Sequence, residues 1–178
     1  MAILSDFDIL RAIKVGQIVV DPFDRKNVGT NSIDVHLGKY LVYPTDRVLS
    51  MKQHTLTYED EIHDEGFVLE PGKLYLGATE EYTETHGFVP YLDGRSSVGR
   101  LGLFIHVTAG RGDAGFCGHW TMELVAVQPL RIYAGVRIGQ LTYHTLTSPP
   151  EVPYDQKKTA SYCNRDPKPQ ASRLWKNF

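Results

Sequence analysis

The second half of the chain concentrates residues whose types and spacing could do chemistry. Arg95-Ser96-Ser97 follows a stretch typical of a strand and precedes a few helix-compatible residues. Free backbone amides, two hydroxyls and a guanidinium would then converge on one point, as they do where proteins hold a phosphate. Either serine could instead only cap a short helix. Residues 95–112 include Arg95, Arg100 and Arg111 but no acidic residue, and this composition favours an anion site.

Glu123 is the second candidate for chemistry. The segment Trp120–Leu124 alternates apolar and polar residues, so in a strand Glu123 and Thr121 share the face opposite the apolar side chains. An isolated glutamate on such a face is ordinarily exposed to solvent. If the face instead lines a cleft beside Ser96 and Arg100, Glu123 is a general base whose charge the arginine holds in place.

Common catalytic and cofactor motifs are absent from the sequence. Neither Gly-Lys pair is followed by Ser or Thr, so there is no P-loop. No Gly-x-Gly-x-x-Gly opens a predicted helix, and there is no Gly-x-Ser-x-Gly. His106 and His119 flank Cys117, but no second pair of ligands stands at zinc spacing. We therefore expect no metal ion bound by these side chains.

Composition indicates a soluble, globular protein. The 178 residues have a net charge of −2 and are 42% hydrophobic, with only short apolar runs, which excludes a membrane span, a disordered tail protein and a globally basic nucleic-acid binder. Residues 1–94 carry 8 basic and 16 acidic residues (−8), and residues 95–178 carry 11 and 5 (+6), so an anion site belongs in the second half. Two cysteines and no charged-then-apolar leader predict a cytoplasmic location.

The local patterns predict one helix and several short strands. Ser5 is typical of an N-cap, Asp8 stands three residues on, and Gly16 is typical of a helix end. Alternating or β-like segments, separated by Gly and Pro turn signals, lie at residues 32–38, 73–79, 120–127 and 137–146. Such spacing predicts an all-β barrel or jelly roll with one or two short helices.

We expect a single domain over residues 1–178. Residues 148–178 contain five prolines and cannot continue a central strand, so we interpret them as an extended C-terminal arm. An arm of this kind often packs on a neighbouring subunit.

The segments described so far resemble the dCTP deaminase branch of the trimeric dUTPase-like family. The specific matches are Gly-Arg-Ser-Ser-x-x-Arg-Leu-Gly (94–102), His-Val-Thr-Ala (106–109), Gly-Asp-x-Gly-Phe (112–116), Thr-x-Glu (121–123) and Arg-Ile-Gly-Gln-Leu (137–141). Weaker similarity runs from Ile3 to Tyr154, so the resemblance covers nearly the whole chain. It implies a distorted β-barrel that assembles as a homotrimer with active sites shared between subunits.

The resemblance implies hydrolytic, zinc-independent removal of the 4-amino group of dCTP, giving ammonia and dUTP for thymidylate synthesis. Zinc nucleobase deaminases need a His or Cys followed by Glu and a Pro-Cys-x-x-Cys pair, which two isolated cysteines cannot supply. A carboxylate must then take the proton as water adds to C4. Glu123 matches that base, Ser96 matches the hydroxyl that positions the water, and Arg100 matches the cation that orients Glu123.

The resemblance also implies substrate contacts. His106 and the backbone of residues 107–109 match the strand that reads the base edge, Asp113 matches a deoxyribose contact, and Tyr154 matches an aromatic contact from the tail. The implied triphosphate contacts are Arg95, Ser97 and Gln140. The other matched positions around the site are Val98, Gly99, Ala109, Arg111, Thr121 and Met122. Mg²⁺ is expected with the substrate's phosphates, and the expected partners are dCTP, dUTP and further copies of the chain, without nucleic acid or membrane.

The tail departs from the family pattern. Family tails usually carry a Lys, and four residues later a Gln or Asn, that touch phosphate, whereas these positions here are Ser161 and Arg165. Ser161 lacks the charge, which Arg165, Lys157 or Lys158 could supply.

The final product is ambiguous in the sequence. Members that go on to cleave dUTP to dUMP and pyrophosphate tend to have Ala-Gly followed by an aromatic residue, and purely deaminating members often have Ala-His-Arg. This chain has Ala109-Gly110-Arg111. Because a guanidinium is always charged and should hold the phosphates where a second water would act, Arg111 favours dUTP as the product, with dUMP as the alternative.

Other functions receive less support. Glu123 next to Thr121 argues against a dUTP pyrophosphatase. A non-catalytic nucleotide-binding trimer would be expected to lack Glu123 or Arg100, and this chain has both. Whether dTTP inhibits the protein is left open.

Overall fold

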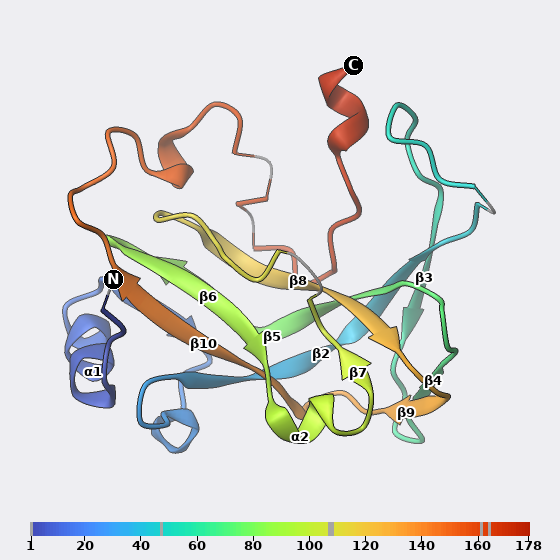
Figure 1. The fold of residues 1–178 in the computed structure, drawn as a ribbon, viewed down its shortest axis with the longest axis horizontal. Coiled ribbons are helices and arrows are strands. Elements are labelled where there is room, and N and C mark those ends of the chain that lie inside the picture. Colours follow the sequence, from blue (N-terminus) through green and yellow to red (C-terminus); the bar gives the residue numbers. More distant parts are fainter. Residues whose placement is uncertain (1, 47, 107–108, 161, 164) are drawn as a thin grey trace.

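The computed structural model describes residues 2–46, 48–106, 109–160, 162–163 and 165–178 (Figure 1). The predicted helix forms as α1 (Asp6–Lys14), and Ser5 Oγ accepts a hydrogen bond from the backbone N–H of Asp8 at 3.5 Å. It stops before Gly16, whose φ of +75° suits a residue without a side chain. Within the described residues no helix has the length and hydropathy of a membrane-spanning segment.

The rest of the described chain is mainly β-structure. Its ten strands are β1 (Ile18–Asp21), β2 (Ile33–Pro44), β3 (Thr57–Glu61), β4 (Phe67–Leu69), β5 (Tyr75–Thr85), β6 (Phe88–Gly94), β7 (Leu103–Phe104), β8 (Cys117–Ala126), β9 (Leu130–Ile132) and β10 (Arg137–Thr145). The short helices are η1 (Arg25–Asn27), α2 (Ser96–Gly99), η2 (Tyr154–Gln156) and η3 (Leu174–Asn177). The four predicted strands correspond to parts of β2, β5, β8 and β10.

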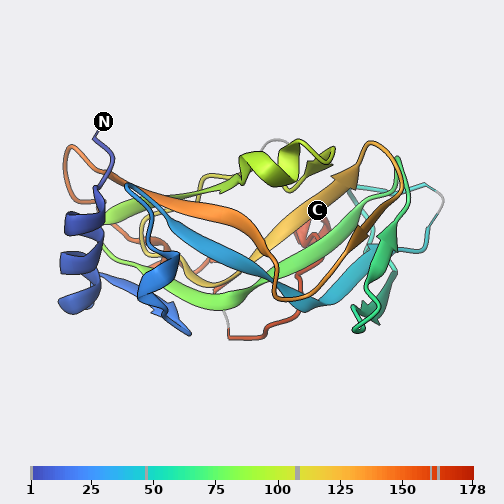
Figure 2. The ribbon, with the colours of Figure 1, turned by 90° about the horizontal axis from the view of Figure 1, so that it is seen from below.

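The strands form one strongly curved antiparallel sheet. Its order is β6-β10-β2-β5-β8-β7, with β1 paired to β5 and β3 paired to β2, while β4 and β9 form a separate pair. Figure 2 shows the long strands bending around a shared interior. The fold is therefore all-β and nearly closed like a barrel, as the sequence predicts.

A bulge in β5 is stabilised by a hydrogen bond from β8. The register between the two strands shifts between Ala78 and Tyr82. Thr79 Oγ1 accepts a hydrogen bond from the backbone N–H of Trp120 at 2.9 Å and donates one to the Glu81 carbonyl at 2.9 Å. These bonds satisfy backbone groups that the interrupted ladder leaves unpaired, and the bulge adds to the bend of the sheet.

The core follows the alternation of the strands. In β8 the side chains of Trp120, Met122 and Leu124 are buried, and Met122 and Leu124 have no exposed area. They pack in one cluster with Val35 and Leu37 of β2. Burial of the apolar face of β8 fixes which way its polar face points.

The C-terminal arm returns to the sheet after β10. Within its described part, residues 148–178 contain only η2 and η3 as regular elements. The backbone N–H of Tyr154 donates to the Ala114 carbonyl at 2.8 Å. This close approach requires Gly115, which has φ of +93° and whose Cβ, if present, would lie 2.7 Å from the Tyr154 nitrogen.

Leu124→Ala tests whether β8 depends on its buried face. We expect the free energy of unfolding, measured by urea denaturation, to fall by about 2–5 kcal/mol, because the change leaves a cavity in the core. Val48 is 82% exposed, so the control Val48→Ala should change stability by less than about 0.5 kcal/mol. Equal effects of the two changes would contradict this packing.

Candidate active site

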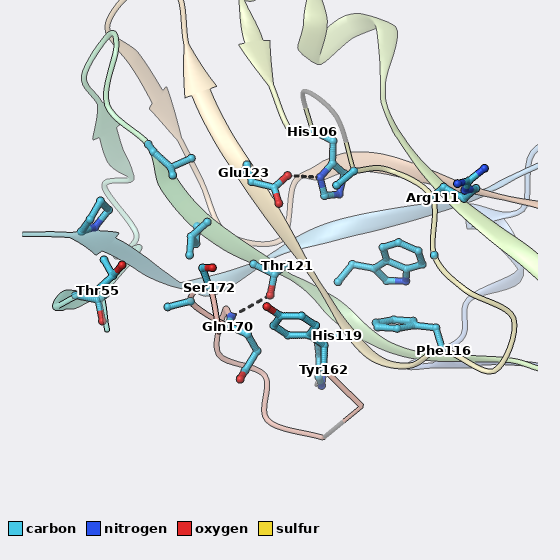
Figure 3. A pocket seen from close by; sticks show the side chains of 18 of the residues that line it. Thr55, His106, Arg111, Phe116, His119, Thr121, Glu123, Tyr162, Gln170 and Ser172 are labelled. Carbon is cyan, nitrogen blue, oxygen red and sulfur yellow. Dashed lines mark hydrogen bonds and ion pairs between the residues drawn. The ribbon is translucent and has the colours of Figure 1, made fainter. Parts of the chain in front are cut away.

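One face of β8 carries a row of polar side chains. Cys117, His119, Thr121 and Glu123 alternate with buried residues and therefore project from the same side of the strand. Figure 3 shows His119, Thr121 and Glu123 along the strand. Glu123 thus faces away from the core, as the sequence predicts, and its side chain keeps 37% of its area exposed.

Glu123 is paired with His106. The Nδ1 atom of His106 lies 2.5 Å from Oε2 of Glu123. The pairing follows from the backbone, because β7 binds the end of β8 with Phe104 opposite Val125, so the residues just after β7 run beside Glu123. With Nδ1 of His106 as the donor, this hydrogen bond fixes the orientation of the Glu123 carboxylate. The sequence predicted that His106 reads the base edge and did not predict this pair.

The environment of His106 is nearly closed. Its side chain is 8% exposed. Its Nε2 atom is buried without a hydrogen-bond partner among the described residues. Val107 and Thr108, whose backbone the sequence assigned to the base edge, lie outside the described residues.

A pocket of about 590 Å³ opens in front of these side chains (Figure 3). This volume lies in the usual range for small-molecule sites, roughly 300–1,000 Å³. The predicted site residues that line it are His106, Ala109, Arg111, Asp113, Thr121, Glu123 and Tyr154. The structure therefore brings the candidate base together with the candidate base-edge, deoxyribose and tail contacts.

The arm forms one wall of this pocket. The backbone N–H of Gln170 donates to Thr121 Oγ1 at 2.9 Å, and Tyr162 and Ser172 also line the pocket. Further along, Lys168 Nζ lies 2.5 Å from a carboxylate oxygen of Glu59 in β3. The arm thus lies on the β8 face of its own chain. Its packing on a neighbouring subunit stays a prediction from the sequence.

The phosphate-binding candidates lie elsewhere. The chain leaves β6 at Gly94 and forms α2, whose N-cap is Arg95 and whose first two residues are Ser96 and Ser97. The cap has no side-chain hydrogen bond, so neither serine serves as the N-cap that the alternative interpretation proposed. Ser96, Ser97 and Arg100 are exposed.

Asp34 of β2 organises a polar cluster beside α2. One carboxylate oxygen lies 2.5 Å from Nη1 of Arg95, and the other accepts a hydrogen bond from Nε2 of Gln140 at 3.0 Å. Arg137 adds a longer ion pair at 3.7 Å. Two of the implied triphosphate contacts are thus held by one carboxylate that is 12% exposed. Asp34 is not among the site residues that the sequence predicts, although the alternation of residues 32–38 places it in a strand.

The two groups of candidates do not meet within one chain. Among the described residues that line the Glu123 pocket, none belongs to the α2 group or to the Asp34 cluster. The predicted residues outside the pocket are Arg95, Ser96, Ser97, Val98, Gly99, Arg100 and Gln140. Met122 is fully buried in the core behind Thr121. The predicted site residues are therefore divided between the Glu123 pocket and the region around α2.

Of the predicted tail contacts, Tyr154 lines the pocket and Arg165 does not. The Arg165 guanidinium stacks 4.5 Å from the ring centre of Tyr82 and lies 3.7 Å from a carboxylate oxygen of Glu84. Burial and the Glu84 carboxylate raise the pKa of Tyr82 to about 12, so its hydroxyl stays protonated at neutral pH. Ser161 lies outside the described residues.

The pocket includes a histidine that the sequence analysis did not assign to it. Nδ1 of His119 lies 3.0 Å from the Thr79 carbonyl, and the ring lines the pocket beside Thr121. His119 stands two residues before Thr121, so the alternation of the strand could have placed both side chains on the same face. In the described part of the chain, no three His, Cys, Asp or Glu side chains converge as metal ligands.

The fold is similar to that of a solved structure. It matches the crystal structure of a 2′-deoxycytidine 5′-triphosphate deaminase from Agrobacterium tumefaciens with a TM-score of 0.63, over 79% of this chain and 47% of that chain. The two sequences are 21% identical, so this likeness establishes the fold alone.

Sequence comparison gives the family. A family model described as dCTP deaminase-like matches residues 3–146. A protein from Cytophaga hutchinsonii is 47% identical over 161 residues, 90% of either chain, and one from Clostridium beijerinckii is 46% identical over 177 residues, 99% of this chain and 98% of its own. Both carry the name "dCTP deaminase, dUMP-forming". The chain belongs to the dCTP deaminase-like family.

The bond between Gln170 and Thr121 predicts how the arm is held. Thr121→Val removes the acceptor without changing the shape of the side chain, at a cost of about 1 kcal/mol. We expect the Gln170 amide to exchange with solvent deuterium about fivefold faster, as measured by NMR. Thr121→Ser keeps the hydroxyl and should exchange at nearly the original rate; unchanged exchange in the valine variant would show that this bond does not hold the arm.

Proposed function

We propose that this chain deaminates dCTP by hydrolysis and then cleaves the resulting dUTP to dUMP and pyrophosphate. The observation that carries the proposal is the Glu123 carboxylate, held by His106 in a nucleotide-sized pocket. The names of the relatives at 46–47% identity support the same reaction.

Glu123 serves as the general base in the first step. It removes a proton from a water molecule as the water oxygen bonds to C4 of the cytosine ring, and it passes that proton to the ring nitrogen. Collapse of the tetrahedral intermediate breaks the bond between C4 and the exocyclic nitrogen, which leaves as ammonia after a further proton transfer. His106 fixes the orientation of the carboxylate.

Cleavage to dUMP is the second step. A water molecule attacks the α-phosphorus, and the bond from that phosphorus to the bridging oxygen breaks, releasing pyrophosphate. In the sequence, Arg111 favours dUTP as the product, whereas the names of the relatives favour the alternative, dUMP. Arg111 lines the pocket with Asp113. Its guanidinium would neutralise phosphate charge in the transition state rather than exclude the second water.

We further propose that each active site combines two copies of the chain. One copy contributes the Glu123 pocket and the other contributes Ser96 and Arg100, together with Arg95 held by Asp34. This arrangement accounts for the separation of the two groups within one chain. A homotrimer provides three equivalent sites of this type. The triphosphate enters as its Mg²⁺ complex, and its charge suits the arginines near α2.

Replacing the proposed base tests the first step. Glu123→Gln keeps the size of the side chain but cannot accept the proton, so ammonia release from dCTP should fall by at least about 10²-fold while dCTP still binds. The control Glu80→Gln changes an exposed carboxylate of β5 outside the pocket and should retain near-normal turnover. Near-normal turnover of the Glu123→Gln enzyme would rule out this assignment.

Product analysis tests the second step. Phosphorus NMR of a complete dCTP digest, combined with an ammonia assay, should give one pyrophosphate and one dUMP for each ammonia released. Accumulation of dUTP with free ammonia would restrict the chain to deamination. If dCTP is not consumed but dUTP is consumed in a parallel digest, the chain is a dUTP pyrophosphatase.

A further inference from the structure

The only two cysteines of the sequence lie against each other in the fold. Cys117 opens β8, and Cys163 lies in the arm, 46 residues further along the chain. Their Sγ atoms are 2.8 Å apart, both thiols are free, and both residues are partly buried. This distance is only about 0.8 Å longer than a covalent sulfur–sulfur bond.

Neighbouring contacts hold this part of the arm against the sheet. Arg165 stacks on Tyr82 and forms an ion pair with Glu84, both residues of β5. The Cys163 sulfur also lies 4.0 Å from the Gly115 carbonyl, in the turn that binds the start of the arm. The contacts of Arg165 with β5 and of Cys163 with Gly115 therefore hold the two thiols together.

We propose that Cys117 and Cys163 are a redox modification site, at which oxidation to a disulfide fastens the arm to β8. Cys117 is the first residue of the polar row of β8, which continues through His119 and Thr121 to Glu123. The same arm segment forms the pocket wall with Tyr162 and Gln170. A covalent tie at Cys163 therefore fixes the wall over the candidate active site.

The oxidant is a low-molecular-weight disulfide such as oxidised glutathione. The Cys163 thiolate attacks one sulfur of the oxidant and displaces one glutathione thiolate. The Cys117 thiolate then attacks Cys163 Sγ in this mixed disulfide and displaces the second glutathione. In total the two cysteines lose two protons and two electrons, and one glutathione disulfide becomes two glutathione thiols.

The environment of Cys117 controls how readily the second step proceeds. Burial and the hydrogen bond to Cys163 raise the pKa of the Cys117 thiol to about 12. Only the thiolate attacks, and below this pKa its fraction increases about tenfold for each unit of pH. Closure of the disulfide should therefore be slow at pH 7 and accelerate as the pH rises.

Peptide mapping tests the modification directly. The full chain is incubated at pH 8.5 with oxidised glutathione or with dithiothreitol, and the digests are compared by mass spectrometry without reduction. We expect the Cys117 and Cys163 peptides to be joined within one chain only after oxidation, with both thiols lost. Cys117→Ser and Cys163→Ser should each give glutathione on the remaining thiol and no joined peptide. Separate glutathione adducts on both cysteines of the unmodified sequence, or a joined peptide only between two copies, would overturn the inference.

The effect on the arm has a separate readout. In the oxidised chain the Gln170 amide should exchange with deuterium at least about fivefold more slowly, and reduction should restore the original rate. Unchanged exchange in a fully oxidised sample would show that the disulfide does not fasten the arm over the pocket.

The effect on turnover rests on the proposed function. Because a fixed arm hinders nucleotide entry, kcat/KM for dCTP should fall at least about fivefold on oxidation and recover with dithiothreitol, while Cys163→Ser is insensitive. If neither form turns over dCTP, the proposed function fails and the mapped disulfide stands. Equal kcat/KM in the two forms of an active enzyme would overturn the claim that the disulfide restricts the pocket.

Discussion

The two-residue period of β8 is the constraint on which the rest of the site depends. Because Met122 and Leu124 are buried on one face of β8, Thr121 and Glu123 project from the opposite face. A slip of one residue in the register with β5 would place Glu123 in the core, at the cost of burying a charge. The packing of the barrel therefore sets the position of the candidate base before any ligand is present.

The same strand connects the base to the rest of the pocket. Its pairing with β7 brings His106 beside Glu123, and its polar face receives the arm through Thr121. The second cluster has a different support, since β2 and β10 hold Arg95 and Gln140 through the Asp34 carboxylate. Each half of the proposed site is thus held in place by its own strands, and under the proposed function two copies of the chain bring the halves together.

Local patterns in the sequence were enough to predict the helix at Ser5, the four longest segments of β-structure and the outward face of Glu123. These features depend on capping and alternation, which are properties of neighbouring residues. The pairing of His106 with Glu123 was not predictable in this way. His106 follows β7, a strand of only two residues whose pairing with β8 is set by contacts distant in sequence. The bulge at Ala78, the role of Asp34 and the path of the arm over β8 depend equally on long-range pairing. The resemblance to a family supplied the candidate residues, but not which of them one chain brings together.

Mixing two inactive variants tests most directly whether the site is shared between copies. Ser96→Ala and Glu123→Gln are co-expressed in equal amounts, and dCTP turnover is compared with that of each variant treated in the same way. In a randomly mixed homotrimer, about one quarter of the sites would combine an intact Ser96 from one copy with an intact Glu123 from the next. The account predicts recovery of about a quarter of the unmodified activity. Activity no higher than the average of the two variants, in trimers shown to contain both, would contradict it.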